Sequence, residues 1–482
     1  MAATMLWYDL ETFGRHSRWD RIAQYAAVRT SADFQELGEP TSVHCLVTPD
    51  YLPDPDACLV TGLTPQRVKA GGVSEAELAA LIHRQMSVPG TCVAGYNNIR
   101  FDDEFVRNLF YRNFYDPFRR EYGDGNSRWD ILDLVRMTHD LRPDGVQWLY
   151  DQQGRPVFQL EQLSEANGIT HQRAHDALSD VRATVQLARL IHDRQPKLFR
   201  FLYSLRKKEA VRKLVNLQSP RPLVHSSAMF TRPGGCTSLV YPLSAHPSQP
   251  NVIICYDLRF DPRDWMELSV SEIRRRVFTP AEELAGEQRV HFKGIHLNRS
   301  PAVAPLATLS AERAAALAID IQSCRANAEL LRRQPQLLRK VRDVYAQHGF
   351  SQPRDPELQI YSGGFFGDED RRTFEQVHSA EPEQLVSAPP AFVDPRGAEL
   401  LRRYLARNHF RLLPKAEQDR WMSHCASRLL APEIEGVTDY GRFRRKVENA
   451  LARTDTPAAH KPILRDLLEY ADWIENNVLS YR

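Results

Sequence analysis

The feature that most constrains this chain is an apolar segment near its N-terminus, residues 5–12, which carries two carboxylates near its end. The segment reads Met-Leu-Trp-Tyr-Asp-Leu-Glu-Thr, a composition typical of a buried β-strand. Side chains at i and i+2 of a strand point to the same face, so Asp9 and Glu11 are expected to project together, about 7 Å apart along the backbone. Two such carboxylates repel each other unless a cation lies between them, and oxygen ligands favour Mg²⁺ or Mn²⁺. The alternative is an edge strand with a solvated acidic face.

The first 195 residues mix strands and helices, which indicates an α/β layer architecture. Ser74 and Glu77 form a predicted capping box at the start of one helix. Another predicted helix, starting at Asp176, keeps apolar residues at near-helical spacing. Besides 5–12, strands are predicted over 24–29, 42–49 and 92–96, and helices over 74–86 and 176–192.

The pattern changes twice after this region. Pro196 and the basic run 206–208 follow the last helix, which places a boundary near 195. Residues 222–300 contain short β-type runs between Pro and Gly turns, which predicts a small barrel or an open sheet. Residues 310–347 are predicted to be helical, and a Pro-rich joint at 353–356 marks a second boundary. Further helices are predicted near 397–408, 415–430, 440–452 and 460–478. The predicted domains are therefore 1–195, 196–351 and 352–482.

Composition limits the classes of function. The formal net charge is +2, so a site for a polyanion would have to be a local patch or groove. The seven cysteines are scattered and no pair has metal-site spacing, which favours buried thiols in a reducing compartment. No apolar run approaches the ~20 residues that span a bilayer, and the first strand leaves no room for a signal segment. We therefore expect a cytoplasmic protein with no membrane association.

Two further segments carry candidate chemistry. Residues 95–105 (Gly-Tyr-Asn-Asn-Ile-Arg-Phe-Asp-Asp-Glu-Phe) run from a strand through a polar turn into a helix that begins with Asp102. Residues 174–181 (Ala-His-Asp-Ala-Leu-Ser-Asp-Val) place His175 five residues before Asp180 at a helix start. Taken alone, the first is explained by the helix dipole and the second by a helix cap with a solvated histidine.

The joint pattern of these segments, in this order, resembles the DEDD superfamily of 3′–5′ exonucleases, in the subclass whose last motif carries histidine. Longer stretches are similar to the bacterial exonuclease I family. They are residues 9–14, 20–27, 59–65, 95–104, 111–117, 126–130 and 174–177, and more weakly 222–225 and 364–366. The similarity thus covers nearly the whole chain, with its most specific motifs in the first 190 residues.

The resemblance implies a fold and an activity. The implied fold is α/β, with a ribonuclease H-like exonuclease domain, a small SH3-like β-barrel domain and a helical C-terminal domain around a DNA groove. The implied activity is processive 3′–5′ degradation of single-stranded DNA to 5′ mononucleotides, in DNA repair and recombination. Its implied partners are DNA with a free 3′ end and the acidic tail of single-stranded-DNA-binding protein, and the enzyme is expected to be a monomer.

By motif match, Asp9, Glu11, Asp102 and Asp180 are the expected metal ligands and His175 is the expected general base. Two Mg²⁺ ions, for which Mn²⁺ can substitute, would neutralise charge and orient the nucleophile in phosphodiester hydrolysis. A histidine with a pKa near neutrality suits removal of a proton from the attacking water.

Single-stranded DNA is held by neutralised phosphates and by bases stacked on aromatic rings. Asn97 and Phe101 flank Asp102, and Phe365 and Phe366 lie in a glycine-rich stretch that could either stack on bases or fasten domains together. The candidate substrate contacts are Glu11, Asn97, Phe101, Arg107, Phe118, Tyr122, Arg136, Arg142, Gln159, Leu160, Phe365 and Phe366.

Two alternative functions remain at this stage. One is a 3′–5′ exoribonuclease, because the 2′-hydroxyl separates RNA from DNA and sequence does not display that contact. Oligoribonuclease-like members of the superfamily are short single domains, whereas this chain continues far beyond its first predicted domain. The other is a non-catalytic module that binds single-stranded DNA, against which the complete set of carboxylates and His175 argues.

Overall fold

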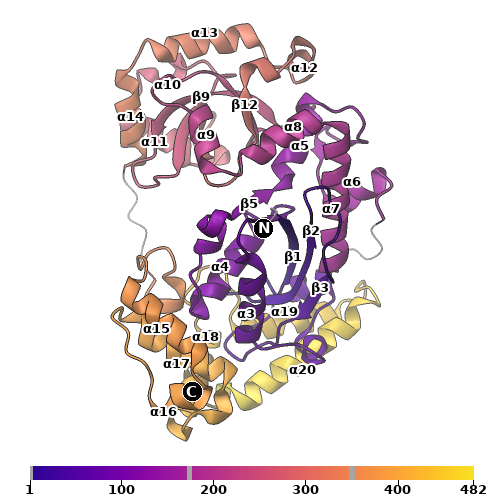
Figure 1. Ribbon diagram of the computed structural model, residues 1–482, viewed down its shortest axis with the longest axis vertical. Coiled ribbons are helices and arrows are strands. Elements are labelled where there is room, and N and C mark those ends of the chain that lie inside the picture. Colours follow the sequence, from indigo (N-terminus) through magenta and orange to yellow (C-terminus); the bar gives the residue numbers. More distant parts are fainter. Residues whose placement is uncertain (1–3, 171–175, 347–352, 482) are drawn as a thin grey trace. The chain divides into compact units, whose positions relative to one another are not determined.

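The computed structural model describes residues 4–170, 176–346 and 353–481 (Figure 1). The chain divides into two compact units. The first unit contains residues 1–127, 172–182 and 351–482, and the second contains residues 128–171 and 183–350. Each unit is described by itself below.

The first unit is built on a sheet in which β1 (Thr4–Thr12) is a central strand. The strand order is β3-β2-β1-β4-β5, with β1 antiparallel to β2 (Ile22–Thr30) and parallel to β4 (Thr91–Gly95). The outer strands are β3 (Thr41–His44) and β5 (Ser127–Asp130), and β5 begins at Ser127 of this unit and continues into residues assigned to the second unit. The alternative reading of β1 as an edge strand is therefore wrong. Predicted strand 42–49 is shorter than expected, because the chain after His44 turns to bridge Val73.

One face of this sheet is covered by helices α3 (Glu75–Met86) and α4 (Asp102–Arg112). Leu6, Tyr8 and Leu10 point into that core. The capping box predicted at the start of α3 is confirmed: the hydroxyl of Ser74 accepts from the backbone N–H of Glu77. Because side chains alternate along β1, its odd-numbered residues project to the opposite face.

The C-terminal helices pack on the N-terminal part in a single hydrophobic core. Phe13, Tyr51 and Phe114 contribute from the N-terminal part, and Trp421 and Phe443 from the C-terminal part. The helices are α15 (Asp368–Ser379), α16 (Pro382–Ser387), α17 (Arg396–Asn408), α18 (Lys415–Leu430), α19 (Tyr440–Ala452) and α20 (His460–Asn477). Segments at opposite ends of the sequence therefore stabilise each other.

The second unit contains a five-stranded antiparallel sheet. Its strands are β8 (Leu223–Ser226), β9 (Thr237–Ala245), β10 (Val252–Asp257), β11 (Phe292–His296) and β12 (Val303–Pro305), in the order β11-β10-β9-β8-β12. In the part of the chain that is described, no pairing joins β11 to β12, so the sheet is open. An open sheet is one of the two arrangements that the β-type runs predicted, whereas the barrel implied by the family resemblance is not closed.

Helices follow this sheet in the sequence. The predicted helix 310–347 is divided into α12 (Ala311–Ala316), α13 (Ile321–Arg332) and α14 (Gln336–Tyr345). The first break follows from a left-handed residue, Ala318, and from Asp320, whose carboxylate caps α13. The second break occurs at Pro335, which cannot continue the hydrogen-bonding pattern of a helix.

The cysteines agree with the expectation from composition. All seven cysteines are free and buried. Among the described helices, none combines the length and the apolar character that a membrane span requires.

Candidate functional site

Strand β1 presents Asp9 and Glu11 together on the face that α3 and α4 leave uncovered. Asp9 lies opposite Ala26 of β2, and Glu11 lies opposite Gln24. Glu11 is 8% exposed and Asp9 is half-buried. The i, i+2 spacing therefore does place both carboxylates on one face of the sheet, as the sequence predicted.

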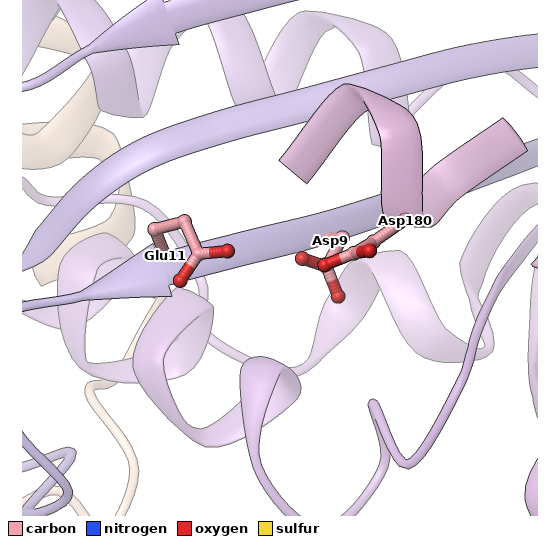
Figure 2. A group of neighbouring side chains, drawn as sticks. All are labelled: Asp9, Glu11 and Asp180. Atoms are coloured by element: carbon pink, nitrogen blue, oxygen red, sulfur yellow. The ribbon is translucent and has the colours of Figure 1, made fainter. Parts of the chain in front are cut away.

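Asp180 completes a group of three converging carboxylates. It lies in the first turn of α7 (Ala177–Arg194), and Figure 2 shows its carboxylate directed toward Asp9 and Glu11. One oxygen from each of the three residues lies within 4.8 Å of the others. An oxygen-only set at this spacing suits a hard divalent cation.

Electrostatics support the same interpretation. Burial, together with Asp9 and Asp180, raises the pKa of Glu11 to about 9. Burial, together with Asp102 and Asp180, raises the pKa of Asp9 well above its usual range. Across the described ranges, no arginine or lysine forms an ion pair with Asp9 or Glu11. A bound cation would favour the ionised form of both.

Asp102 is the first residue of α4 and is buried. Its charge raises the pKa of Asp9, so it belongs to the same electrostatic cluster. His175, the expected general base, lies outside the described residues, and its role stays a prediction.

The structure adds two polar residues to the site that sequence reasoning did not assign. The side-chain amide of Gln24 donates to a carboxylate oxygen of Asp176 at 3.3 Å and to the hydroxyl of Ser42 at 3.0 Å. The charge of Asp176 in turn raises the pKa of Glu11. The signal that could have found Gln24 is its polarity in an otherwise apolar strand, opposite Glu11.

An aromatic group in the first unit contains several of the predicted DNA contacts. Phe365 is 79% exposed and meets the ring of Phe118 edge to face at 5.7 Å. Tyr361 lies 6.0 Å from Phe118 and donates to Glu104. Tyr122 is 69% exposed. These rings offer open faces on which bases could stack.

Other predicted contacts in this unit already have structural partners. Arg107 is buried and paired with Glu121 and Glu104. Phe366 is buried against Tyr111 and Phe374, which is the packing role that the sequence left open for it.

The residues beside Asp102 are placed by a strained turn. Asn97 adopts a left-handed conformation with a φ of 64°. Phe101, half-buried, packs on Phe105 at 5.1 Å.

The remaining predicted contacts belong to the second unit. Arg136 is buried and paired with Asp133, and Arg142 donates to the carbonyl of Thr308 at 3.2 Å. Gln159 is exposed at the N-cap of α6 (Leu160–Ala166), which begins with half-buried Leu160. Their roles in binding stay predictions.

Three family models match successive parts of the chain. They are Exonuclease over residues 6–188, Exonuclease I SH3-like domain over residues 206–347 and Exonuclease I C-terminal domain over residues 354–474.

Relatives match over most of their length. Exodeoxyribonuclease I of Escherichia coli (strain K12) is 43% identical over 91% of this chain and 92% of its own. The Haemophilus influenzae enzyme of the same name is 42% identical over 89% of this chain and 91% of its own. The crystal structure of E. coli exonuclease I with a dA16 oligonucleotide aligns with a TM-score of 0.94 and 40% identity, covering 98% of this chain and 100% of that one. The chain therefore belongs to the exodeoxyribonuclease I family.

Proposed function

We propose that this protein is a processive exodeoxyribonuclease that degrades single-stranded DNA from its 3′ end and releases 5′ mononucleotides. The observation that carries the proposal is the convergence of Asp9, Glu11 and Asp180 within 4.8 Å, in a chain of this family. Structures of E. coli exonuclease I with single-stranded oligonucleotides support the choice of substrate. A role in DNA repair and recombination follows from the family resemblance.

Asp9, Glu11, Asp102 and Asp180 are the residues that would hold two Mg²⁺ ions, with Mn²⁺ as a substitute. Support comes from the oxygen-only ligand set, and a zinc-bound E. coli exonuclease I–DNA complex is a similar structure. Divalent cations bound there would neutralise the scissile phosphate and orient the attacking water. Among the chain's own residues, the four carboxylates fix where that phosphate is presented, and His175 takes the proton from the water.

The DNA strand is held by aromatic and polar residues. Exposed Phe365 and Tyr122, with Phe118, offer stacking faces to unpaired bases. The other proposed contacts are Glu11, Asn97, Phe101, Arg107, Arg136, Arg142, Gln159, Leu160 and Phe366. For the buried members, which are Glu11, Arg107, Arg136 and Phe366, a positioning role fits their packing.

The acidic tail of single-stranded-DNA-binding protein is the proposed protein partner. A structure named SSB/Exonuclease I in complex with the inhibitor CFAM, which aligns with a TM-score of 0.89, supports it. The protein is proposed to act as a monomer in the cytoplasm. We also retain the division into domains 1–195, 196–351 and 352–482, which the three family matches support.

The test is degradation of 3′-labelled strands of matched sequence. DNA and RNA are compared as single strands and as duplexes, with free and with blocked 3′ ends. We expect chelator-sensitive release of mononucleotides from single-stranded DNA with a free 3′ end. Asp180→Asn should abolish release, and His175→Ala should lower turnover by ~10²–10⁴-fold, the range for a lost general base. Faster release from RNA would favour the exoribonuclease, and binding without any release would favour the non-catalytic module.

A further inference from the structure

A side-chain cluster outside the sites described above joins an aspartate, a histidine and a tyrosine within the second unit. His139 and Asp140 lie in α5 (Ile131–Leu141). Tyr150 is the last residue of β6 (Leu149–Tyr150), which pairs with β7 (Pro156–Val157) in a hairpin. Nδ1 of His139 lies 2.6 Å from Oδ1 of Asp140, and Nε2 lies 3.0 Å from the hydroxyl oxygen of Tyr150. One imidazole therefore connects a carboxylate to a phenol.

The hydrogen bonds of the neutral imidazole can run in only one direction. An ionised carboxylate only accepts hydrogen bonds, so Nδ1 carries the proton that is donated to Asp140. Nε2 then has the free lone pair and accepts from the hydroxyl of Tyr150. In a serine–histidine–aspartate triad, the histidine removes the proton of the hydroxyl nucleophile from the same position.

Asp140 is fixed in its place at the end of this chain of hydrogen bonds. It is fully buried, and its second oxygen, Oδ2, accepts from the backbone N–H of Cys236 at 2.9 Å. A Cβ atom on Gly235 would lie 2.9 Å from Oδ1, so only a glycine lets the backbone pass this close to the carboxylate. Among the described residues, no arginine or lysine forms an ion pair with Asp140. Its charge is therefore available to stabilise an imidazolium on His139.

Three aromatic rings hold the imidazole in place. Trp148, Tyr150 and Phe158 each meet the ring of His139 edge to face, with centroid distances of 5.1, 5.6 and 5.5 Å. His139 is 2% exposed, whereas Tyr150 is 54% exposed. A reagent in solution can therefore reach the tyrosine, while the base behind it is enclosed.

We propose that Tyr150 is a nucleophilic tyrosine that accepts an acyl group from a small acyl phosphate. In this step Nε2 of His139 takes the hydroxyl proton, and the phenol oxygen forms a bond to the acyl carbon. The bond between that carbon and the phosphate oxygen breaks, phosphate leaves with the electron pair, and the proton passes from Nε2 to the phosphate. The products are an aryl ester on Tyr150 and inorganic phosphate, with no change of oxidation state.

The contacts of Tyr150 favour attack at carbon over attack at phosphorus. Attack at a carbonyl carbon needs a phenol that can be deprotonated and a donor with a good leaving group, and an acyl phosphate brings that leaving group with it. Attack at phosphorus would also need cations that neutralise the phosphoryl oxygens. Among the described residues, the hydroxyl of Tyr150 is hydrogen-bonded to His139 alone.

The test treats the full chain with acetyl phosphate at neutral pH and follows the acetylation of individual tyrosines by peptide mass spectrometry. Tyr122 is the internal reference, because it is 69% exposed, more than Tyr150, and among the described residues no histidine is hydrogen-bonded to it. Tyr150 should be acetylated ~10²-fold faster than Tyr122, the lower end of what a general base contributes. Hydroxylamine should release the acetyl group, as it does from an aryl ester and not from a lysine amide.

Two substitutions separate the effect of the histidine from the effect of exposure. His139→Gln removes the base and should lower the rate at Tyr150 to that at Tyr122. Asp140→Asn should lower the rate at Tyr150 at least about tenfold, because a neutral amide does not stabilise the imidazolium.

The matched control is Asp193→Asn. Asp193 pairs with His192 at 3.0 Å on an exposed part of the same unit, and its substitution should leave the rate at Tyr150 unchanged. Unfolding temperatures of all variants are compared. Asp140→Asn, together with the comparison of the two tyrosines in wild type, keeps the test decisive if His139→Gln unfolds.

Three results would overturn the inference. They are equal acetylation rates at Tyr150 and Tyr122 in wild type, an unchanged rate at Tyr150 in a folded His139→Gln or Asp140→Asn variant, and addition of a phosphoryl group to Tyr150 in place of an acetyl group. Either of the first two would mean that the cluster only fastens the hairpin to α5. None of these measurements depends on nucleotide release, so the outcome is independent of the proposed function.

Discussion

In the candidate active site, the buried carboxylate of Glu11 lowers the stability of the metal-free protein, and a bound cation would offset that loss. Its carboxylate is buried beside Asp9 and Asp180, and its pKa is raised to about 9. Between the unfolded value of about 4.5 and the folded value of about 9, the native state binds more protons than the unfolded state. The metal-free protein should therefore lose stability as pH rises through this window.

Glu11→Gln tests this at the level of one residue. In EDTA, the substitution should raise the unfolding temperature at pH 8 more than at pH 5, because it removes the charge that is disfavoured there. Wild type should gain stability from Mn²⁺, ~2.7 kcal/mol at a hundredfold excess over Kd, and the variant should lose most of that gain. Asp33→Asn, at an exposed acid, is the control, and a pH-independent effect of Glu11→Gln would contradict the prediction.

Phe365 and Phe366 are adjacent but occupy opposite environments. Phe365 is 79% exposed, whereas Phe366 packs on Tyr111 and Phe374 beneath the guanidinium of Arg396. Phe366→Ala should cost ~3–5 kcal/mol of stability, as for other buried phenylalanines. Phe365→Ala should leave stability unchanged and weaken single-stranded DNA binding by ~1–3 kcal/mol. Chemical denaturation and binding titrations separate the two, and equal stability losses would refute the assignment.

At the scale of elements, the sequence predicted those features that depend only on residues close together in the chain. The alternation of β1 fixed the side on which Asp9 and Glu11 lie, and Ser74 with Glu77 fixed the start of α3. The end of β3 was not predictable, because it depends on a bridge from Cys45 to Val73, far along the chain. That Asp180 of α7 lies close to Asp9 and Glu11 of β1 was likewise implied by the family motifs and not by the spacing of these residues in the sequence.

Gln24 connects two of these elements. Its amide links β2 to Asp176, immediately before α7, whose first turn carries Asp180. Gln24→Ala should loosen the start of α7 and raise the Mn²⁺ concentration needed for half-maximal activity, with a smaller effect on the rate at saturating Mn²⁺. Ser42→Ala removes the other partner of Gln24 and serves as the control. An unchanged metal requirement in Gln24→Ala would show that the contact does not position the site.

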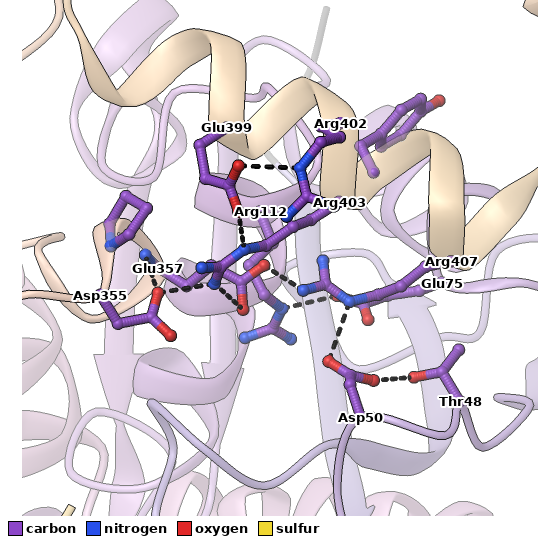
Figure 3. A network of polar contacts seen from close by, with 12 residues as sticks. Thr48, Asp50, Glu75, Arg112, Asp355, Glu357, Glu399, Arg402, Arg403 and Arg407 are labelled. Carbon is purple, nitrogen blue, oxygen red and sulfur yellow. Dashed lines mark hydrogen bonds and ion pairs between the residues drawn. The ribbon is translucent and has the colours of Figure 1, made fainter. Parts of the chain in front are cut away.

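At the scale of the whole molecule, a buried ion network in the first unit joins residues as far as 357 positions apart in the sequence (Figure 3). Arg407 of α17 contacts Asp50 at 3.1 Å and also pairs with Glu357. Arg21 contacts Asp50 at 3.0 Å, and Arg112 contacts Glu75 at 2.7 Å. No periodicity in the sequence predicted this network, because each charged residue, taken alone, could be explained as a solvated surface charge.

The charges in the network determine how the first unit responds to acid. Burial by itself would raise the pKa of Asp50 and of Glu357, but Arg407 and its neighbouring arginines outweigh burial and hold both well below their usual range. Carboxyl groups of this kind contribute stability above their unfolded pKa of about 4, and that stability is lost as pH falls through the folded pKa.

Arg407→Met should therefore destabilise the protein at pH 7 by ~3–5 kcal/mol, because it leaves Asp50 and Glu357 buried with fewer cations. The variant should also lose less stability than wild type between pH 5 and pH 3, since less of its stability depends on those ionised carboxylates. Arg420→Met is the control, because Arg420 is 60% exposed and lies 3.7–3.8 Å from Glu417 and Glu399, where an ion pair contributes ~0–1 kcal/mol. Denaturant unfolding at several pH values measures both effects.

Because the network joins the strand region that carries the candidate site to the C-terminal helices, both regions are expected to unfold cooperatively in one transition. Separate transitions in wild type would show that the two segments fold independently and that the network is not what unites them.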